Sequence, residues 1–475
     1  MRYAVEPTAV PTRKETTVAK KPNLIVILID DLRFDETGAS GHPYMKTPHI
    51  DRLAHEGAMF ENAFHPTPLC SPNRASILTG QYASRHGIID NVGRDVASHR
   101  LDNYHIALQA LGYETAHVGK WHMGNDSSPR PGYDHWVSFK GQGKLVDPIL
   151  WENGGEHQVE GYMTDILNAR AVEFVKGKRT QPFALFFAHK AVHPDLVQNA
   201  SGGIDASSIG GYTLPARHRD LYQGMTYPKR PSMLPLEQVA KDKPALRMMF
   251  EMRAQPSSRD ILAAMDGGTQ EEIRKRAAMM ASVDEGVGML LETLEQTRQL
   301  DNTCIVFLGD NGFFFGEHGI TIERRFAYEE GIRTAFYVRY PKRIAAGTKR
   351  GEMILAIDIA PTLIELAGGK PGDTIQGRSL VPLMKGRPKR WRQSFLCEYW
   401  SESAWPWIVG MGYKAVRTER WKYIYWTQQQ GMAEMYDLEK DPYELQNLAF
   451  DPAHAKVRQA MKKELRKLTS EALGI

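Results

Sequence analysis

Cysteine and long apolar segments are both scarce in this 475-residue sequence. The three cysteines, Cys70, Cys304 and Cys397, lie far apart and lack the spacing of metal ligands, so neither a disulfide framework nor a zinc site is expected. The longest strongly apolar run, residues 24–29, falls well short of the roughly 20 residues that a membrane-spanning helix needs. We therefore expect no membrane partner.

Neither sign of charge is in excess. Lys and Arg number 60 and Asp and Glu 56, and a formal net charge of +4 over this length is not the footprint of a nucleic-acid partner. The composition, 42% hydrophobic and 24% charged, is that of a globular protein with a large core. Residues 1–21 form a polar tail without the apolar core of a signal peptide, so the compartment stays open: the protein is cytoplasmic, or a leader has been removed.

Short apolar runs alternate with stretches of helical periodicity along residues 22–390. This alternation predicts an α/β fold, with a large mixed sheet sandwiched by helices. From residue 391 to 475 the pattern changes to short strands and one charged helix, which predicts a small antiparallel α+β subdomain. The expected strands of the large sheet are 24–29, 114–118, 183–188 and 303–308; its main helices are 47–56, 161–175 and 271–299; and the later strands are 394–399, 413–417, 421–426 and 434–437, followed by a helix from Asp451-Pro452 to Leu473.

Residues 199–260 break the alternation. They contain two Gly-Gly pairs, six prolines and little periodicity. A segment of this length with little regular structure is either a surface insertion or a loop that covers a substrate. Both interpretations remain open on the sequence alone.

Acidic and amide side chains follow two of the predicted strands. Asp30 and Asp31 come directly after residues 24–29, and Asp310 and Asn311 lie just beyond residues 303–308. Oxygen ligands delivered to one edge of a sheet suit a hard divalent cation, and without a cation the carboxylates would repel one another. A single acidic pair after a strand often only caps a helix, but two such pairs favour a metal site.

Cys70 begins the segment Cys-Ser-Pro-Asn-Arg-Ala-Ser-Ile-Leu-Thr-Gly (70–80). Pro72 suits the first position of a helix, so Cys70 is expected at a helix N-terminus, with Arg74 one turn further along. That position stabilises negative charge and activates a nucleophile. The alternative is a buried structural cysteine, which is the usual fate of a free cysteine.

The pattern Cys-x-Pro-x-Arg followed by Ala-Ser-x-Leu-Thr-Gly resembles the signature of the formylglycine-dependent sulfatases of the alkaline phosphatase superfamily. Further segments are similar to this family in the same order, including Gly-Lys-Trp-His-Met-Gly (119–124), Gly-Asp-Asn-Gly (309–312) and Gly-Glu-His-Gly (316–319). The resemblance covers about residues 22–450 and implies an alkaline-phosphatase-like fold and sulfuric ester hydrolase activity. It also implies that a separate formylglycine-generating enzyme oxidises Cys70, and it favours a periplasmic or secreted protein.

The resemblance implies metal-binding and catalytic roles for the residues at matching positions. It implies one calcium ion held by Asp30, Asp31, Asp310, Asn311 and the oxidised Cys70. Arg74 and Lys120 would supply fixed positive charge, His122 would accept a proton and His193 would protonate the leaving group. Because Lys120 and His122 are two residues apart, an extended backbone would point both side chains to the same side.

One position departs from the family pattern. Relatives usually carry a lysine shortly after Gly-Glu-His-Gly that contacts the sulfate, and counting back from Tyr328 places Arg324 there. Arginine can clamp a sulfate but does not release a proton at ordinary pH, so proton donation would fall to His193. His318 is a possible substrate contact, or it orders its own loop.

The substrate is less well specified. The run Phe-Ala-His-Lys-Ala-Val-His-Pro (187–194) is similar to bacterial relatives that act on sulfated polysaccharides, which favours a sulfated saccharide from a polysaccharide or glycosaminoglycan. Trp400, Trp405 and Trp407 could stack on sugar rings, although core packing is the commoner role. The alternatives are a phosphonate monoester or phosphodiester hydrolase of the same superfamily, and an inactive binding protein that kept the fold.

Overall fold

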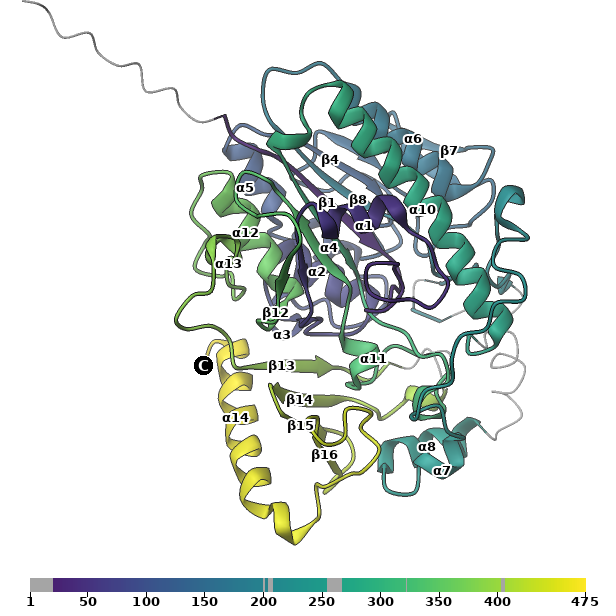
Figure 1. Cartoon of the computed structure of the whole chain (residues 1–475), viewed down its shortest axis with the longest axis vertical. Coiled ribbons are helices and arrows are strands. Elements are labelled where there is room, and N and C mark those ends of the chain that lie inside the picture. Colours follow the sequence, from purple (N-terminus) through teal and green to yellow (C-terminus); the bar gives the residue numbers. More distant parts are fainter. Residues whose placement is uncertain (1–19, 200, 204–207, 254–266, 322, 403–405) are drawn as a thin grey trace, which may run out of the picture.

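The computed structural model describes residues 20–475, apart from residues 200, 204–207, 254–266, 322 and 403–405. Its centre is an eight-stranded sheet in the order β11-β2-β10-β9-β1-β8-β4-β5 (Figure 1). Only β10 runs antiparallel to its neighbours. The strands are β1 (Asn23–Ile29), β2 (Ala58–Phe60), β4 (Glu114–Gly119), β5 (His135–Val137), β8 (Phe183–Ala188), β9 (Thr303–Gly309), β10 (Phe336–Arg339) and β11 (Thr348–Arg350), so the four predicted strands are confirmed.

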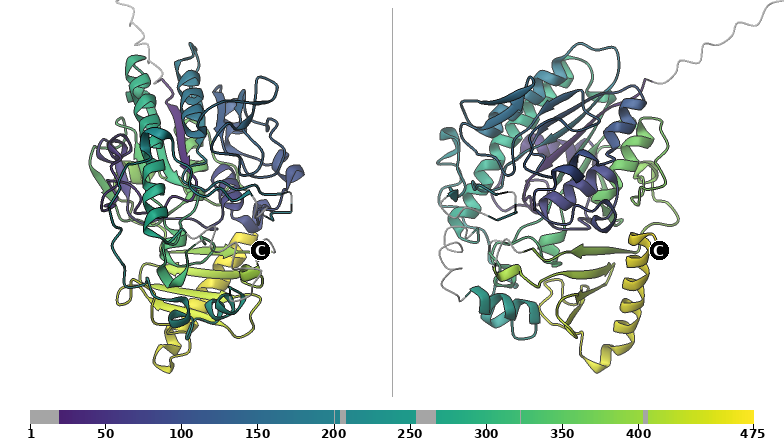
Figure 2. Two further views of the ribbon diagram at one scale, coloured as in Figure 1. Left: turned by 90° about the vertical axis from the view of Figure 1, so that its right-hand side faces the viewer. Right: turned by 180° about the vertical axis from the view of Figure 1, so that it is seen from behind.

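Helices cover both faces of this sheet (Figure 2). Alternate residues of β1 explain the two layers: Ile25, Ile27 and Ile29 pack into one apolar cluster, and Leu24, Val26 and Leu28 into another. The first cluster includes side chains of α1 (Pro48–His55), α6 (Met163–Lys176) and α10 (Gln270–Gln296); the second includes those of α2 (Cys70–Thr79), α5 (Tyr104–Ala110) and α12 (Ile359–Leu366). The predicted helix-covered α/β fold is confirmed.

The long helix α10 packs unusually closely against α6. A Cβ atom built on Gly286 would lie 1.9 Å from Oδ1 of Asn168, and one built on Gly288 would lie 2.8 Å from Cδ2 of His49. The two glycines therefore do not interrupt α10. They permit the close approach of α6 and α1 to it.

A smaller antiparallel sheet in the order β13-β14-β15-β16 lies beside the large domain (Figure 1). It comprises β13 (Ser394–Tyr399), β14 (Tyr413–Thr418), β15 (Trp421–Trp426) and β16 (Ala433–Asp437), and α14 (Ala455–Leu473) packs on it. Asp451 caps a short 3₁₀ turn, residues 452–454, that precedes α14. A further apolar cluster, separate from the two that flank the large sheet, joins this small sheet to Leu69, Phe314 and Tyr328 of the larger domain. The predicted small α+β unit is confirmed, while its boundary at residues 390 and 391 stays a prediction.

The segment 199–260 is more regular than the sequence suggested. Its described part contains α7 (Leu236–Val239) and α8 (Pro244–Arg253), and Leu246 and Met249 of α8 belong to the same apolar cluster as Trp407. The expectation of little regular structure is therefore wrong for these residues, because their apolar side chains find partners on the small sheet.

The remaining elements are short. They are β3 (Ala63–Phe64) paired with β12 (Ile354–Leu355), β6 (Ile149–Glu152) paired with β7 (Gly155–Gln158), α3 (Ala83–His86), α4 (Asp95–His99), α11 (Glu329–Ile332) and α13 (Val381–Lys385). Across the described part of the chain, no helix combines the length and apolar character needed to cross a membrane.

Candidate active site

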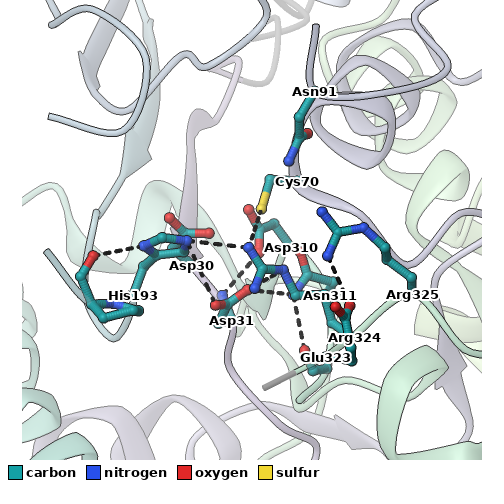
Figure 3. A network of polar contacts seen from close by, with 12 residues as sticks. Asp30, Asp31, Cys70, Asn91, His193, Asp310, Asn311, Glu323, Arg324 and Arg325 are labelled. Atoms are coloured by element: carbon teal, nitrogen blue, oxygen red, sulfur yellow. Dashed lines mark hydrogen bonds and ion pairs between the residues drawn. The ribbon is translucent and has the colours of Figure 1, made fainter. Parts of the chain in front are cut away.

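The two acidic pairs meet at the carboxyl end of the central sheet. Strands β1 and β9 are parallel neighbours with Ile29 opposite Gly309, so the residues that follow them lie side by side. The backbone N–H of Asp31 donates to Oδ1 of Asp310 at 3.0 Å, and Nδ2 of Asn311 donates to Oδ1 of Asp31 at 2.7 Å (Figure 3). The expected convergence is confirmed.

These oxygens have the character of a cation site. Oδ1 of Asp30, Oδ2 of Asp31 and Oδ1 of Asn311 are buried and have no hydrogen-bond partner among the described residues. Ligand atoms of Asp30, Asp31, Cys70 and Asp310 all lie within 4.8 Å of one another. Burial, reinforced by the charge of Asp30, raises the pKa of Asp310 to about 7 despite Arg74. Buried carboxylates clustered this closely, with oxygens that lack a hydrogen-bond partner, fit a hard divalent cation.

Three buried cationic side chains surround the carboxylates. Nε of Arg74 lies 2.8 Å from Oδ2 of Asp310, and Nζ of Lys120 contacts Oδ2 of Asp30. Burial raises the pKa of Asp30, but the charges of Lys120 and Arg74 outweigh it and hold that pKa well below its usual range. The third cation is Arg324, which contacts Asp31. Three carboxylates thus face three cations, and a bound divalent cation would make the site net positive and attractive to an anion.

Cys70 lies at the centre of this arrangement. It is the first residue of α2 and is fully buried, which confirms its expected position at the helix N-terminus; Pro72 is the third residue of the helix rather than its first. Burial, together with the charge of Asp30, raises the pKa of the Cys70 thiol. For the unmodified residue, the desolvation of a thiolate therefore works against the helix terminus.

Arg324 joins three parts of the site. Its Nε lies 3.2 Å from Oδ1 of Asp31, and its Nη2 lies 3.2 Å from Nε2 of His193 and 3.9 Å from Sγ of Cys70 (Figure 3). Burial lowers the pKa of Arg324, but the charge of Asp31 more than offsets this, so the guanidinium stays charged. Arg324 thus lies beside Asp31, His193 and Cys70, while its equivalence to the lysine of the family stays a prediction.

His193 is neutral in this arrangement. Its Nδ1 lies 2.8 Å from the carbonyl oxygen of Pro194, which only accepts, and its Nε2 faces Nη2 of Arg324, which only donates. Nδ1 therefore carries the hydrogen and Nε2 is the acceptor. Burial also lowers the pKa of His193 well below its usual range. The expected proton donor cannot donate from Nε2 while Arg324 holds that atom.

His122 and Lys120 are linked through side chains rather than through an extended backbone. The φ angle of His122 is 63°, so the expected extended conformation is wrong at this residue. Nε2 of His122 lies 2.7 Å from Oε1 of Gln198, and Nζ of Lys120 donates to Oε1 of Gln142 at 2.5 Å. Burial and the charge of Lys120 lower the pKa of His122 well below its usual range.

His318 lies at the junction with the small sheet. Its ring stacks on Tyr328 at 4.1 Å between centroids, and its Nε2 is 3.6 Å from Oε2 of Glu330. The interactions described for its side chain are with this junction and not with the cluster around Cys70. This placement favours a histidine that orders its loop over a substrate contact.

Of the three tryptophans considered for sugar stacking, Trp407 belongs to the protein core. Trp407 is fully buried, and its Nε1 donates to Oε1 of Glu323 at 2.9 Å, so stacking of Trp407 on a sugar is excluded by its core position. Trp400 is half-buried, and Trp405 lies outside the described residues.

Sequence reasoning missed several neutral residues of the site. Asn73 donates to the carbonyl oxygen of Asp310 at 2.5 Å, and Asn91 accepts from the backbone N–H of Ser71 at 3.1 Å. Asn73 lies inside the Cys-x-Pro-x-Arg segment and could have been noticed there. Asn91, Gln142 and Gln198 belong to no motif, and uncharged amides in loops carry no signal in a single sequence.

A cavity of about 380 Å³ adjoins the two glutamines. Its wall combines apolar side chains with two lysines, including Phe139, Leu196, Val197, Lys140 and Lys144. Both lysines are exposed, and Nζ of Lys140 lies 3.0 Å from Oε2 of Glu156. The cavity offers a partly apolar surface with positive charge beside Lys120 and His122.

Comparison with known proteins agrees with this geometry. The profile of the sulfatase family matches residues 22–369, and that of the C-terminal part of N-sulphoglucosamine sulphohydrolase matches residues 316–471. The chain is 31% identical over 503 residues to an N-acetylglucosamine-6-O-sulfatase of Bacteroides thetaiotaomicron, covering 97% of this chain and 87% of that protein.

Solved structures show the same fold. One, described as BT4656 in complex with its substrate D-glucosamine-2-N,6-O-disulfate, superimposes with a TM-score of 0.81 at 27% identity over 96% of this chain and 98% of the other. A phosphonate monoester hydrolase of Agrobacterium radiobacter gives 0.74 at 22% identity over 95% and 96%, a likeness of fold alone. The arrangement around Cys70, the family profile over most of the chain and the relative of nearly full length lead to one conclusion: the chain belongs to the sulfatase family of hydrolases, in the alkaline phosphatase superfamily.

Proposed function

We propose that the protein releases sulfate from a sulfated carbohydrate, a polysaccharide or glycosaminoglycan fragment, with a formylglycine made from Cys70 and one bound calcium ion. The observation that carries this proposal is the position of Cys70 at the N-terminus of α2, beside unpartnered carboxylate oxygens and three cationic side chains. Burial raises the pKa of the Cys70 thiol, which disfavours a thiolate nucleophile and supports a role for the oxidised residue.

The residues present fit both groups. The cation would be held by oxygens of Asp30, Asp31, Asp310 and Asn311, which are of the type that calcium prefers. One oxygen each of Asp30, Asp31 and Asn311 has no hydrogen-bond partner among the described residues. When bound, calcium supplies a Lewis acid that polarises a sulfate oxygen and lowers the pKa of a coordinated hydroxyl. Formylglycine, when present, supplies a hydrated aldehyde whose hydroxyl is a nucleophile and whose chemistry releases sulfate without attack by water at sulfur.

The protein's own cations bind and orient the sulfate group. Arg74 and Lys120 are buried and held by Asp310 and Asp30, so their positions are set before substrate arrives. Such pre-organised charge costs little reorganisation when charge shifts during the reaction. Arg324 would turn its Nη2 from His193 to the sulfate. That movement would free Nε2 of His193, the atom through which this residue would exchange a proton with the leaving group.

The carbohydrate substrate class rests on the relatives and on the cavity. Two similar proteins carry names or titles that specify sulfated glucosamine derivatives. The cavity beside Gln142 and Gln198, with its apolar wall and Lys140 and Lys144, has room for a sugar ring and positive charge for an anionic substituent. A formylglycine-generating enzyme would be the maturation partner.

The test is a paired release assay. The protein and its Cys70→Ala variant would be produced together with a formylglycine-generating enzyme, and mass spectrometry would measure conversion of residue 70. Both would be given an aryl sulfate, a panel of sulfated saccharides and a phosphonate monoester. Sulfate release from a saccharide that is lost in Cys70→Ala is the expected result. Faster cleavage of the phosphonate than of any sulfate ester would overturn the proposal, as would no release from any sulfate ester by fully converted protein.

A further inference from the structure

Two glutamine side chains connect the two basic residues that follow β4. Nζ of Lys120 donates to Oε1 of Gln142 at 2.5 Å, and Nε2 of Gln142 donates to Oε1 of Gln198 at 3.3 Å. The same Oε1 of Gln198 lies 2.7 Å from Nε2 of His122. Nε2 of Gln198 donates to the carbonyl oxygen of Gly202 at 2.9 Å. The result is a continuous hydrogen-bonded bridge from Lys120 to His122.

The two ends of the bridge determine how each amide is oriented. The ammonium of Lys120 can only donate, so the group of Gln142 that faces it must be the carbonyl oxygen. The backbone carbonyl of Gly202 can only accept, so the group of Gln198 that faces it must be the NH₂. Neither amide can be flipped without setting two donors or two acceptors against each other.

This orientation determines where the hydrogen of His122 lies. An amide oxygen only accepts, so Nε2 of His122 must carry the hydrogen that it shares with Gln198. Nδ1 is then the basic nitrogen of the ring. It is buried and has no hydrogen-bond partner among the residues that the structure describes. Nε2 of His122 is thus held by a hydrogen bond, whereas Nδ1 is available to accept a proton.

We propose that Gln142 and Gln198 are positioning residues for the reaction, which select the Nε2-protonated tautomer of His122 and so leave its Nδ1 as the proton acceptor of the site. The inference rests on the proposed function for its catalytic meaning, but the tautomer itself is a property of the protein alone. Gln142 follows β5 and Gln198 follows β8, so the bridge ties two loops to the end of β4. Both side chains also line the 380 Å³ cavity, which places the bridge between the substrate side and the two basic residues.

The tautomer can be read directly by NMR on protein that still carries Cys70. Deuterated protein with ¹⁵N-labelled histidine would be measured by two-bond ¹H–¹⁵N correlation, and His122→Phe would identify the signals of residue 122. We expect wild type to carry the hydrogen on Nε2. Gln198→Met should lose this preference, whereas Gln198→Glu should keep it because a carboxylate oxygen also only accepts. Gln109→Met, a glutamine of α5 that binds Asp134, is the matched control and should leave the signals unchanged.

Kinetics of the converted enzyme give the second readout. Gln198→Met should lower kcat about 10- to 100-fold with little change in KM, by analogy with the loss of a hydrogen-bond partner that orients a metal-bound histidine. Gln198→Glu should retain more of the wild-type kcat than Gln198→Met does. Gln142→Met should also lower kcat.

A hydrogen on Nδ1 in wild type, or an unchanged tautomer in a folded Gln198→Met protein, would overturn the inference. If Gln198→Met does not fold, the wild-type spectrum and the Gln142→Met variant still test which nitrogen of His122 carries the hydrogen. If converted wild type cleaves no sulfate ester, the proposed function fails while the spectrum continues to test the tautomer.

Discussion

Arg324 offers the most direct test of the proposed site, at the position where we expect relatives to carry a lysine. Its guanidinium reaches Asp31 through Nε and both His193 and Cys70 through Nη2. Arg324→Lys keeps the charge but replaces a planar group of five N–H donors with a single ammonium on a flexible chain. One nitrogen cannot occupy both the Nε and the Nη2 positions. The variant therefore loses either the ion pair of Nε with Asp31 or the charged hydrogen bond of Nη2, at the position where we place the sulfate.

The size of the effect follows from that loss. A hydrogen bond to a charged group contributes about 1.5–3 kcal/mol, and each 1.4 kcal/mol is a factor of ten in rate. We therefore expect kcat/KM of Arg324→Lys to fall about 10- to 150-fold. The side chain is only 6% exposed, so water cannot readily replace the missing donor.

The assay is sulfate release from an aryl sulfate, normalised to the formylglycine content of each preparation. Arg325→Lys is the matched control, because Arg325 is the adjacent arginine but pairs with Glu323 and Glu402 instead of with Asp31 and His193. It should lower thermal stability while changing kcat/KM less than tenfold. Equal losses in the two variants, or unchanged or increased turnover in Arg324→Lys, would refute the reasoning.

Three further predictions concern the metal, the core and pH. Calcium at about 100 times its Kd should raise the free energy of unfolding by about 2.7 kcal/mol. Asp310→Asn should abolish this rise, and mass spectrometry should find no bound calcium in that variant. Trp407→Phe should lower stability by about 1–3 kcal/mol, since Glu323 loses a buried donor, and should leave KM unchanged; a raised KM at wild-type stability would contradict the core role. Burial lowers the pKa of Lys190 from its usual value to about 8. Below pH 8 the buried ammonium therefore lowers the free energy of unfolding by about 3 kcal/mol, and this loss of stability shrinks as the pH rises toward 10.5. Lys190→Met should therefore raise the thermal midpoint at pH 7.5 by more than at pH 10, and an equal gain at both would argue against a charged buried lysine.

Much of the scaffold was predictable because it depends on local patterns. Continuous apolar runs specified β1, β8 and β9 to within one residue, since a strand buried on both faces has no polar positions. Asp30 and Asp310 could be placed at one edge because parallel strands end together. The segment 236–253 was missed because its helices are stabilised by the small sheet and not by a clear period of their own.

The sequence by itself determined which chemical groups the protein has and where the chain delivers them: carboxylates after two central strands and Cys70 at the start of α2. The tertiary structure alone decided the proton positions and the neutral partners. Gln142 and Gln198 approach Lys120 and His122 across 22 and 76 residues of chain, and Arg324 approaches His193 across 131. Such contacts follow from how loops pack over the end of the sheet. That packing sets burial, hydrogen-bond direction and hence the charge state of each histidine.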